Sequence, residues 1–129
     1  LADHGLRAAA VSWWSLLGAD LKRLTPGDGG HIGHAGQTET SVQLALQPSL
    51  VDRESVRAEH CADLAARMAA PFAGVGYAPP LPAGEAPAGV YGDATAADPR
   101  VGETVLDLAA DRLVAFVEAF DAEPAPRQP

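Results

Sequence analysis

The chain has 129 residues, the size of one domain. Nine Lys and Arg residues against 17 Asp and Glu residues leave a formal net charge of −8, which excludes a nucleic-acid-binding protein because phosphate contacts need clustered Lys and Arg. Apolar residues make up 47% of the chain, enough for a core, but no apolar run is long enough to span a membrane. The single Cys61 excludes an intramolecular disulfide, and no signal peptide is visible at the start.

The first residues of the chain favour an alternation of helix and strand. Residues 1–7 predict the end of a helix. Ala8 to Leu17 is a nearly continuous apolar run that contains Trp13 and Trp14, and such a run is typical of a buried strand in a parallel sheet. A helix followed by a buried strand is half of a βαβ crossover, so we expect an α/β fold. Residues 20–25 are polar and predict a turn or a short helix.

The middle of the chain combines a glycine-rich loop with a helix. Residues 26–36 contain five glycines, which allow the backbone to bend sharply or to approach a ligand closely. Residues 37–47 predict a helix that Thr38 caps and Pro48 ends. The side chains expected on its buried face are Val42, Ala45 and Leu46.

The second half predicts two more helices separated by a long loop. One helix follows Val51, with Asp52 as its cap and Cys61 on its apolar side as a buried, inert thiol. Residues 71–92 form the loop, and residues from 122 onward are expected to fray. The last helix carries an apolar stripe at helical spacing, which we expect to belong to the core, formed by Val105, Leu106, Ala109, Leu113, Phe116, Val117 and Phe120.

Chemically active side chains gather between Gly33 and Ser41. His34 lies in the glycine loop directly ahead of a predicted helix, and histidine exchanges protons near neutral pH. Glu39, five residues later, either orients this histidine or binds a metal, and exposed amides at the helix start are able to hold an oxyanion. The alternative is a surface loop in which His34 has no chemical role and Glu39 only complements the helix dipole.

The adjacent tryptophans Trp13 and Trp14 are the other candidate ligand-binding feature. Neighbouring side chains point to opposite faces of a strand, so one indole is expected in the core while the other meets a ligand at the end of the strand. The alternative is that both indoles belong to the core.

These segments resemble the creatininase family of metal-dependent amidohydrolases. The string from His34 to Val51 follows the family's pattern of His, a small residue, Gly, two variable positions and Glu-Thr-Ser, then a short apolar helix, Pro and Leu-Val. Residues 10–14 resemble the family's strand that ends in an aromatic-Trp pair. Residues 89–97, followed by Gly102 and the last helix, resemble its Gly-x-x-Gly-Asp-x-x-x-Ala segment. The resemblance spans about residues 1–120.

The resemblance implies an α/β fold of three layers with a mainly parallel sheet, often assembled as a homo-oligomer. It implies hydrolysis of a non-peptide C–N bond, such as that of a cyclic amide or formamide, and one relative is instead a peptidase that trims the mycofactocin precursor. The implied cofactor is zinc or manganese, which activates a water for attack on the carbonyl carbon. We therefore expect a cytoplasmic enzyme with a small-molecule amide substrate and with neither nucleic-acid nor membrane partners.

Individual positions carry the family's roles as the resemblance implies them. His34 matches the catalytic histidine that moves a proton to the departing nitrogen, and Trp14 matches a tryptophan that packs on the substrate ring. Gly33 and Ala35 flank the histidine as substrate-binding positions, and Glu39, the Glu of the motif, is assigned as a metal ligand or as support for one. Gly33 stands where creatininase has an acidic residue, which weakens the case for creatinine as the substrate.

The family's main metal-ligand strings do not occur in the chain. These are a Glu-x-His segment, a following Asp, and an Asn-Gly-His string. Family members are longer and the chain starts at Leu1, so residues 1–121 are expected to be the C-terminal half of the domain, with 122–129 as a flexible tail. We expect most metal ligands to come from the missing N-terminal half. This polypeptide alone is expected to be inactive and to expose an apolar face on the first strand and its helices. The alternative is a non-catalytic partner or a degenerate remnant.

Overall fold

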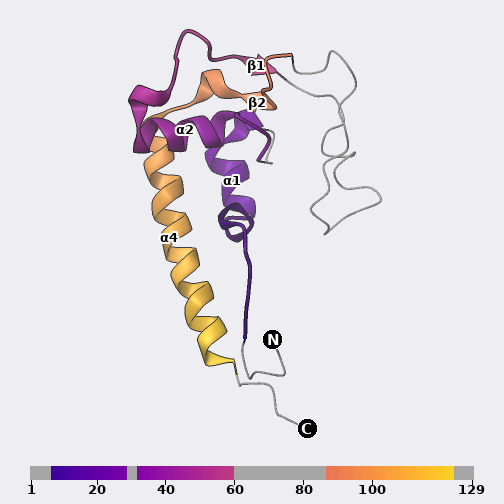
Figure 1. Cartoon of the computed structure of the whole chain (residues 1–129), viewed down its shortest axis with the longest axis vertical. Helices are drawn as coiled ribbons and strands as arrows, with labels where there is room; N and C mark the ends of the chain where they lie inside the picture. The colour runs from indigo at the N-terminus through magenta and orange to yellow at the C-terminus, as the bar shows by residue number, and fades with distance from the viewer. Residues whose placement is uncertain (1–6, 29–31, 60–86, 124–129) are drawn as a thin grey trace, which may run out of the picture.

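The computed structural model describes residues 7–28, 32–59 and 87–123. Three helices, α1 (Ala19–Leu24), α2 (Gln37–Leu46) and α4 (Pro99–Ala122), are the main regular elements of this part of the chain (Figure 1). Two short strands, β1 (Ala58–Glu59) and β2 (Gly92–Asp93), lie above α2 in that view. Short 3₁₀ helices cover Trp13–Leu16, Pro26–Asp28, Pro48–Leu50 and Ala94–Ala96.

The predicted last helix is confirmed as α4, and its start has a clear cause. The side chain of Asp98 accepts a hydrogen bond from the backbone N–H of Arg100 at 2.8 Å, and Pro99 occupies the first helical position. The predicted helix of residues 37–47 is confirmed as α2, and the predicted turn or short helix of residues 20–25 is confirmed as α1.

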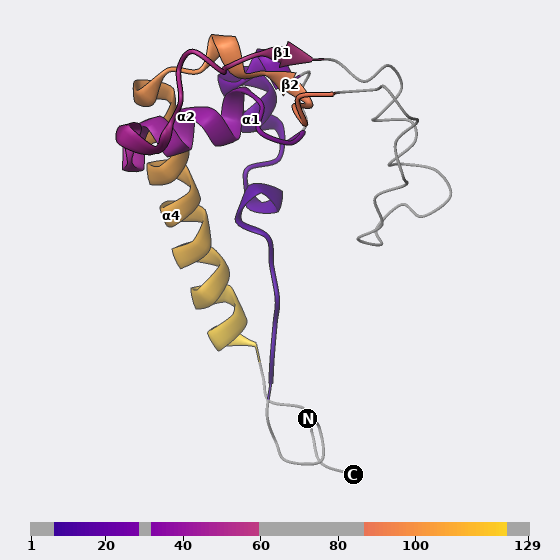
Figure 2. The same cartoon turned by 45° about the horizontal axis from the view of Figure 1, so that its top comes forward.

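Helix α2 crosses α4 near the N-terminal end of α4 (Figure 2). A Cβ atom on Gly102 would lie 2.0 Å from the carbonyl oxygen of Ser41, so only glycine permits this approach. The Ser41 hydroxyl accepts a hydrogen bond from the backbone N–H of Asp98 at 3.1 Å, and both Ser41 and Thr38 are fully buried. The buried side of α2 is therefore small and polar over much of its length. The expectation that Leu46 is buried is wrong, since it is 64% exposed at the last turn of the helix.

The apolar core lies where α1 packs against α4. Leu17, Leu21 and Val105 are buried at its centre, and Val105 is fully enclosed. Partly buried apolar side chains surround these three residues, namely Trp13, Leu24, Ile32, Val42, Val101, Leu108 and Ala109.

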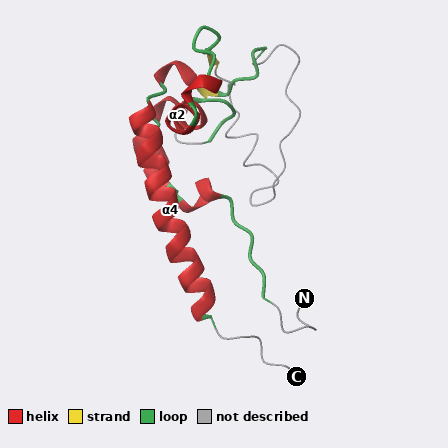
Figure 3. Ribbon diagram, turned by 60° about the vertical axis from the view of Figure 1, so that its left-hand side comes forward, coloured by secondary structure: helices red, strands yellow, loops and turns green. Residues whose placement is uncertain are grey.

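The predicted buried strand of residues 8–17 is wrong for this structure. Residues 8–12 form an exposed segment without regular secondary structure that runs beside the C-terminal half of α4, and Trp13–Leu16 is a 3₁₀ helix (Figures 1 and 3). A strand needs a neighbour to pair its backbone groups, and no other strand lies beside this segment in the described ranges. Arg7 anchors the segment instead, because its guanidinium donates to the carbonyl oxygen of Phe120 at 2.7 Å and stacks over the Phe120 ring.

The apolar stripe of α4 is buried only at its N-terminal end. Val105 is fully buried, but Leu113 is 43% exposed and Val117 is 55% exposed. Val114 beside them is 57% exposed. The expectation that the whole stripe belongs to the core is therefore wrong, while the expected exposed apolar face is present.

The sheet of the described residues has two strands and is antiparallel. Ala58 pairs with Asp93, and Glu59 pairs with Gly92. The mainly parallel sheet and the three layers that were expected are not confirmed by this pair. Gly92 lies in β2, so the predicted loop of residues 71–92 ends before it, and residues 71–86 lie outside the described ranges.

The helix predicted after Val51 does not begin there. Residues 53–55 form a turn and β1 follows shortly afterwards. Asp52 caps this turn instead of a helix, because its carboxylate accepts hydrogen bonds from the Glu54 N–H at 3.1 Å and the Ser55 hydroxyl at 2.6 Å. The rest of that predicted helix, with Cys61, falls outside the described residues, as does most of the helix end expected in residues 1–7. Within the described residues, no helix is both long and apolar enough to cross a bilayer.

Candidate functional site

His34 is fixed by its backbone, and its side chain is exposed. Its N–H donates to the carbonyl oxygen of Tyr91 at 3.2 Å, and the Tyr91 N–H donates to the carbonyl oxygen of His34 at 2.7 Å. Gly33 lies tightly against the same residue, since a Cβ atom there would be 1.7 Å from the Tyr91 carbonyl oxygen. The bridge therefore holds the backbone of the loop, and His34 itself is exposed.

The turn that follows His34 is held by the motif's own polar side chains. Ala35 has a φ of +50°, in the left-handed region that costs a residue with a Cβ atom energy. The carboxylate of Glu39 accepts a hydrogen bond from the Ala35 N–H at 2.5 Å, and the Thr40 hydroxyl donates to the Ala35 carbonyl oxygen at 3.2 Å. Glu39 and Thr40 thus stabilise this strained turn, in the way that a capping box satisfies the start of a helix.

Asp28, which the sequence patterns did not single out, caps helix α2. Its carboxylate accepts hydrogen bonds from the N–H groups of Gln37 at 2.6 Å and Thr38 at 2.7 Å, and from the Thr38 hydroxyl at 2.6 Å. Thr38 was expected to be the cap, but it is the second helical residue, and the residue at the cap position is Gly36, which has no side chain. The hypothesis of first-turn amides that bind an oxyanion is corrected for Gln37 and Thr38, because Asp28 already occupies both.

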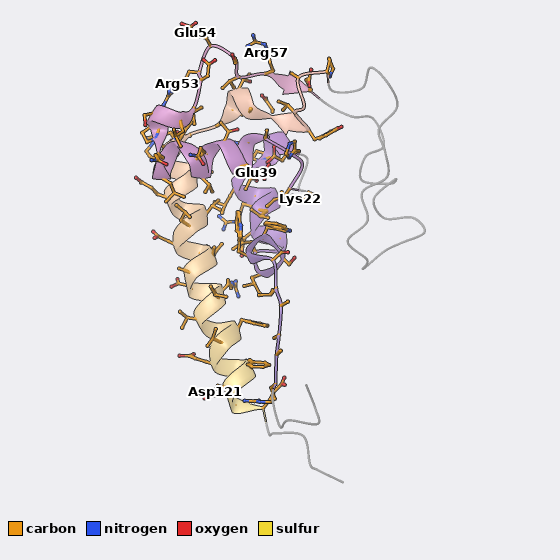
Figure 4. The ribbon with its side chains drawn as sticks, viewed as in Figure 1. Lys22, Glu39, Arg53, Glu54, Arg57 and Asp121 are labelled. Carbon is orange, nitrogen blue, oxygen red and sulfur yellow. The ribbon has the colours of Figure 1, made fainter. Side chains whose placement is uncertain are left out.

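A groove of about 440 Å³ opens beside the His34 loop. Helix α2 forms one wall through Glu39, Thr40 and Gln43, and the loop of residues 50–57 forms the other. Figure 4 shows Glu39 below this loop, which carries the labelled side chains of Arg53, Glu54 and Arg57. The described residues that line the groove are His34, Ala35, Glu39, Thr40, Gln43, Leu50, Val51, Asp52, Ser55, Val56, Arg57, Val90 and Ala94. The structure thus brings three of the five predicted site residues to one groove and adds Gln43 as a lining residue.

The other two predicted site residues do not line the groove. Gly33 packs against Tyr91, as described above. Trp13 packs against the core and meets Trp14 edge to face, with ring centroids 5.6 Å apart and an interplanar angle of 79°. Trp14 is 42% exposed. One indole is thus in the core and one is accessible, and the role of Trp14 toward a substrate stays a prediction.

One carboxylate of the groove is held in its charged form. Hydrogen bonds from the Ser55 hydroxyl and the Glu54 N–H lower the pKa of Asp52 below its ordinary value of 3.8. Asp52 is exposed and belongs to the loop opposite Glu39. At neutral pH the groove therefore contains at least one fixed negative charge, at its rim.

The described residues do not form a metal site of their own. No group of three or more His, Cys, Asp or Glu side chains able to hold a metal ion occurs within residues 7–28, 32–59 and 87–123. Glu39 lines the groove, and one of its carboxylate oxygens is bonded to the Ala35 N–H. A complete set of ligands for zinc, which takes about four, or for manganese therefore needs residues beyond this part of the chain.

Comparison with known families identifies the class of protein. The model of the Creatininase family, described as creatinine amidohydrolase, matches residues 2–117. The chain therefore belongs to the creatininase family, an α/β family of amidohydrolases that are generally metal-dependent. Neither the curated proteins nor the solved structures gave a significant match. The resemblance inferred from the motif of residues 34–51 and the two flanking segments is confirmed.

Proposed function

We propose that the protein is a metal-dependent amidohydrolase that hydrolyses a non-peptide C–N bond of a cyclic amide or a formamide. The observation that carries the proposal is the exposed His34 imidazole, held by the Tyr91 bridge at a groove in a chain of the creatininase family. An imidazole in this position has the chemistry to deliver a proton to the departing nitrogen.

Each remaining site residue has a proposed role. Ala35 borders the groove next to His34, and with Gly33 it leaves room for the substrate beside the imidazole. Trp14 packs on a substrate ring through its accessible indole face. Glu39 contributes to a zinc or manganese site, either as a ligand through its second oxygen or by supporting the loop, and the other ligands come from residues outside the described ranges. Gly33, which replaces an acidic residue of creatininase, favours an amide other than creatinine.

The wider assignment follows from the same proposal. Residues 1–121 are the C-terminal part of a creatininase-family domain, and residues 122–129 are its tail. The exposed apolar side chains on α4 support further protein packing against this face. The active form is a cytoplasmic homo-oligomer with a small-molecule amide substrate.

The test compares His34→Asn with wild type in the full reading frame, assayed with zinc or manganese against a panel of cyclic amides and formamides. We expect kcat to fall by about 10²–10⁴-fold with the metal content unchanged, because only proton transfer is removed. Lys22→Gln, an exposed change outside the groove, is the control. Equal turnover by the His34 variant would refute the proposed role.

The 129-residue chain by itself is expected to bind metal weakly and to hydrolyse none of these amides, since its described residues lack a ligand cluster. Tight, stoichiometric zinc binding with amidase turnover by this chain would contradict the half-domain proposal. Metal analysis of the same samples distinguishes weak metal binding without turnover from stoichiometric zinc binding with turnover.

Two alternatives remain. One is a peptidase like the one that trims the mycofactocin precursor, and the neighbouring genes distinguish this from hydrolysis of small rings. The lack of a ligand cluster in the described residues also suits a non-catalytic partner or remnant. Ligand strings upstream in the reading frame would favour the enzyme, and a start codon at this point would favour the partner.

A further inference from the structure

Three separate segments of the chain meet at the carboxylate of Asp28. Its own segment is the 3₁₀ helix Pro26–Asp28, and Asp28 as a whole is only 8% exposed. The second segment is the start of α2, which donates three hydrogen bonds of 2.6–2.7 Å from Gln37 and Thr38. The third segment is β2, whose Gly92 lies directly against the carboxylate. A buried carboxylate with this many donors holds its neighbours strongly, because charged hydrogen bonds gain strength away from water.

Two glycines make this junction possible. A Cβ atom on Gly36 would lie 2.2 Å from Oδ1 of Asp28, and one on Gly92 would lie 2.3 Å from the same oxygen. Gly92 also has a φ of +135°, which side chains with a Cβ atom rarely adopt. The backbone at Gly36 and at Gly92 is therefore in direct contact with the Asp28 carboxylate, and neither position has space for a side chain.

These two glycines lie close to the two residues, His34 and Tyr91, that form the backbone bridge. Gly36 follows His34 by two residues, and Gly92 follows Tyr91 directly. The paired hydrogen bonds between His34 and Tyr91 are thus flanked, on both segments of the chain, by a glycine that contacts Asp28. A change at Asp28 reaches both partners of the bridge at once, whereas the loss of an ordinary helix cap reaches only one helix.

We propose that Asp28 is a positioning residue for His34. It fixes the start of α2 and the β2 segment relative to each other, and so sets the position from which the imidazole faces the groove. The catalytic meaning of this role rests on the proposed function, because it assumes that His34 transfers the proton. The structural part, the control of the His34–Tyr91 bridge by Asp28, stands apart from any activity.

The experiment measures amide hydrogen exchange and the His34 imidazole NMR signals in the full 129-residue chain without substrate. Asp28→Asn keeps the shape of the side chain but turns one acceptor oxygen into a donor that faces an N–H group. We expect exchange at the His34 and Tyr91 amides to rise by about tenfold, the scale of a lost helix cap, and the His34 signals to shift. Exchange at Val105 in α4 is expected to stay within about twofold of wild type, because local opening around His34 does not unfold α4.

Two further variants separate positioning from general weakening. Asp98→Ala removes the cap of α4 and is expected to raise exchange in the first turn of α4 while the His34 signals keep their positions. Asp28→Glu keeps the charge but adds a methylene to a space closed by Gly36 and Gly92. It is therefore expected to raise exchange at the His34 and Tyr91 amides, as Asp28→Asn does.

The proposal is overturned if Asp28→Asn leaves the His34 and Tyr91 amides as protected as in wild type, or if it raises exchange uniformly over the whole chain. If the variant does not fold, Thr38→Val removes the hydroxyl that donates to Asp28 and also contacts the Thr25 hydroxyl, and a smaller rise at the His34 and Tyr91 amides is the supporting result. No change at those amides in the Thr38 variant would count against the proposal. Lack of amidase activity in the metal-loaded wild-type protein from the full reading frame would refute the proposed function and leave this measurement valid.

Discussion

The close crossing of α2 over α4 makes a specific prediction for Gly102→Ala. Gly102 is the fourth residue of α4, and replacement of a helical glycine by alanine normally adds up to about 1 kcal/mol of stability. At this position the new Cβ atom would lie 2.0 Å from the carbonyl oxygen of Ser41 and 3.0 Å from the Cβ atom of Ala45. Since real Cβ contacts do not fall below 3.0 Å, the two helices must separate by about 1 Å.

The sign of the effect depends on which contribution is larger. Overpacking in a rigid interface costs about 1–3 kcal/mol, and the obstacle here is backbone, which cannot rotate away. Separation of the helices also strains the hydrogen bond from the Asp98 N–H to the Ser41 hydroxyl, which links the start of α4 to α2. After the helix-propensity gain is subtracted, we expect Gly102→Ala to lower the free energy of unfolding by about 1–2 kcal/mol.

Urea unfolding followed by circular dichroism measures this change as a shift of the midpoint at constant slope. Ala110→Gly is the matched control, because Ala110 lies exposed in the same helix and reports the propensity difference without a clash. It is expected to lose about 1 kcal/mol. If Gly102→Ala were as stable as wild type or more stable, the close contact between α2 and α4 would not exist in solution.

Two predictions concern the ends of α4. Arg7→Ala is expected to destabilise the chain by about 0.5–1 kcal/mol and to raise amide exchange in the last turn, because the guanidinium bonds the carbonyl oxygens of Phe120 and Glu123 at the helix C-terminus; unchanged exchange there would show that this contact contributes nothing. At the other end, the side-chain hydrogen bond from Arg100 lowers the pKa of Asp98 below its ordinary value of 3.8. The folded state therefore prefers the charged form, so this stabilisation is complete above the unfolded pKa and is lost as pH falls through the folded pKa. Asp98→Ala is expected to reduce the acid-range fall of the urea midpoint, and an unchanged fall would contradict the role of this carboxylate.

Local sequence signals were sufficient for the long helices and for the His34 loop. Pro99 and the apolar spacing of α4 act within a few residues. The glycines before α2 disfavour a helix or strand in residues 32–36, so a loop was expected there. The motif of residues 34–41 also identified the family, which the match over residues 2–117 confirms. These features depend on neighbours in the sequence, so the sequence alone reveals them.

The predictions that failed depend on partners distant in the sequence. The apolar run of residues 8–17 has the composition of a buried strand, but a strand forms only beside another strand, and none lies next to it in the described ranges. Leu113 has the spacing of a core residue and is still exposed, because burial requires a second surface to cover it.

The sequence by itself determined the acidic character of the chain, its principal helices, its family and the motif that carries His34. The tertiary structure alone decided what holds that motif in place. Asp28 reaches α2 across nine residues and touches Gly92 from a segment far away along the chain, and Ser41 meets Gly102 between two helices. The physical reason is that hydrogen bonding and close packing depend on distance in space, and a carboxylate flanked by glycines has no sequence pattern that shows which helix it will cap.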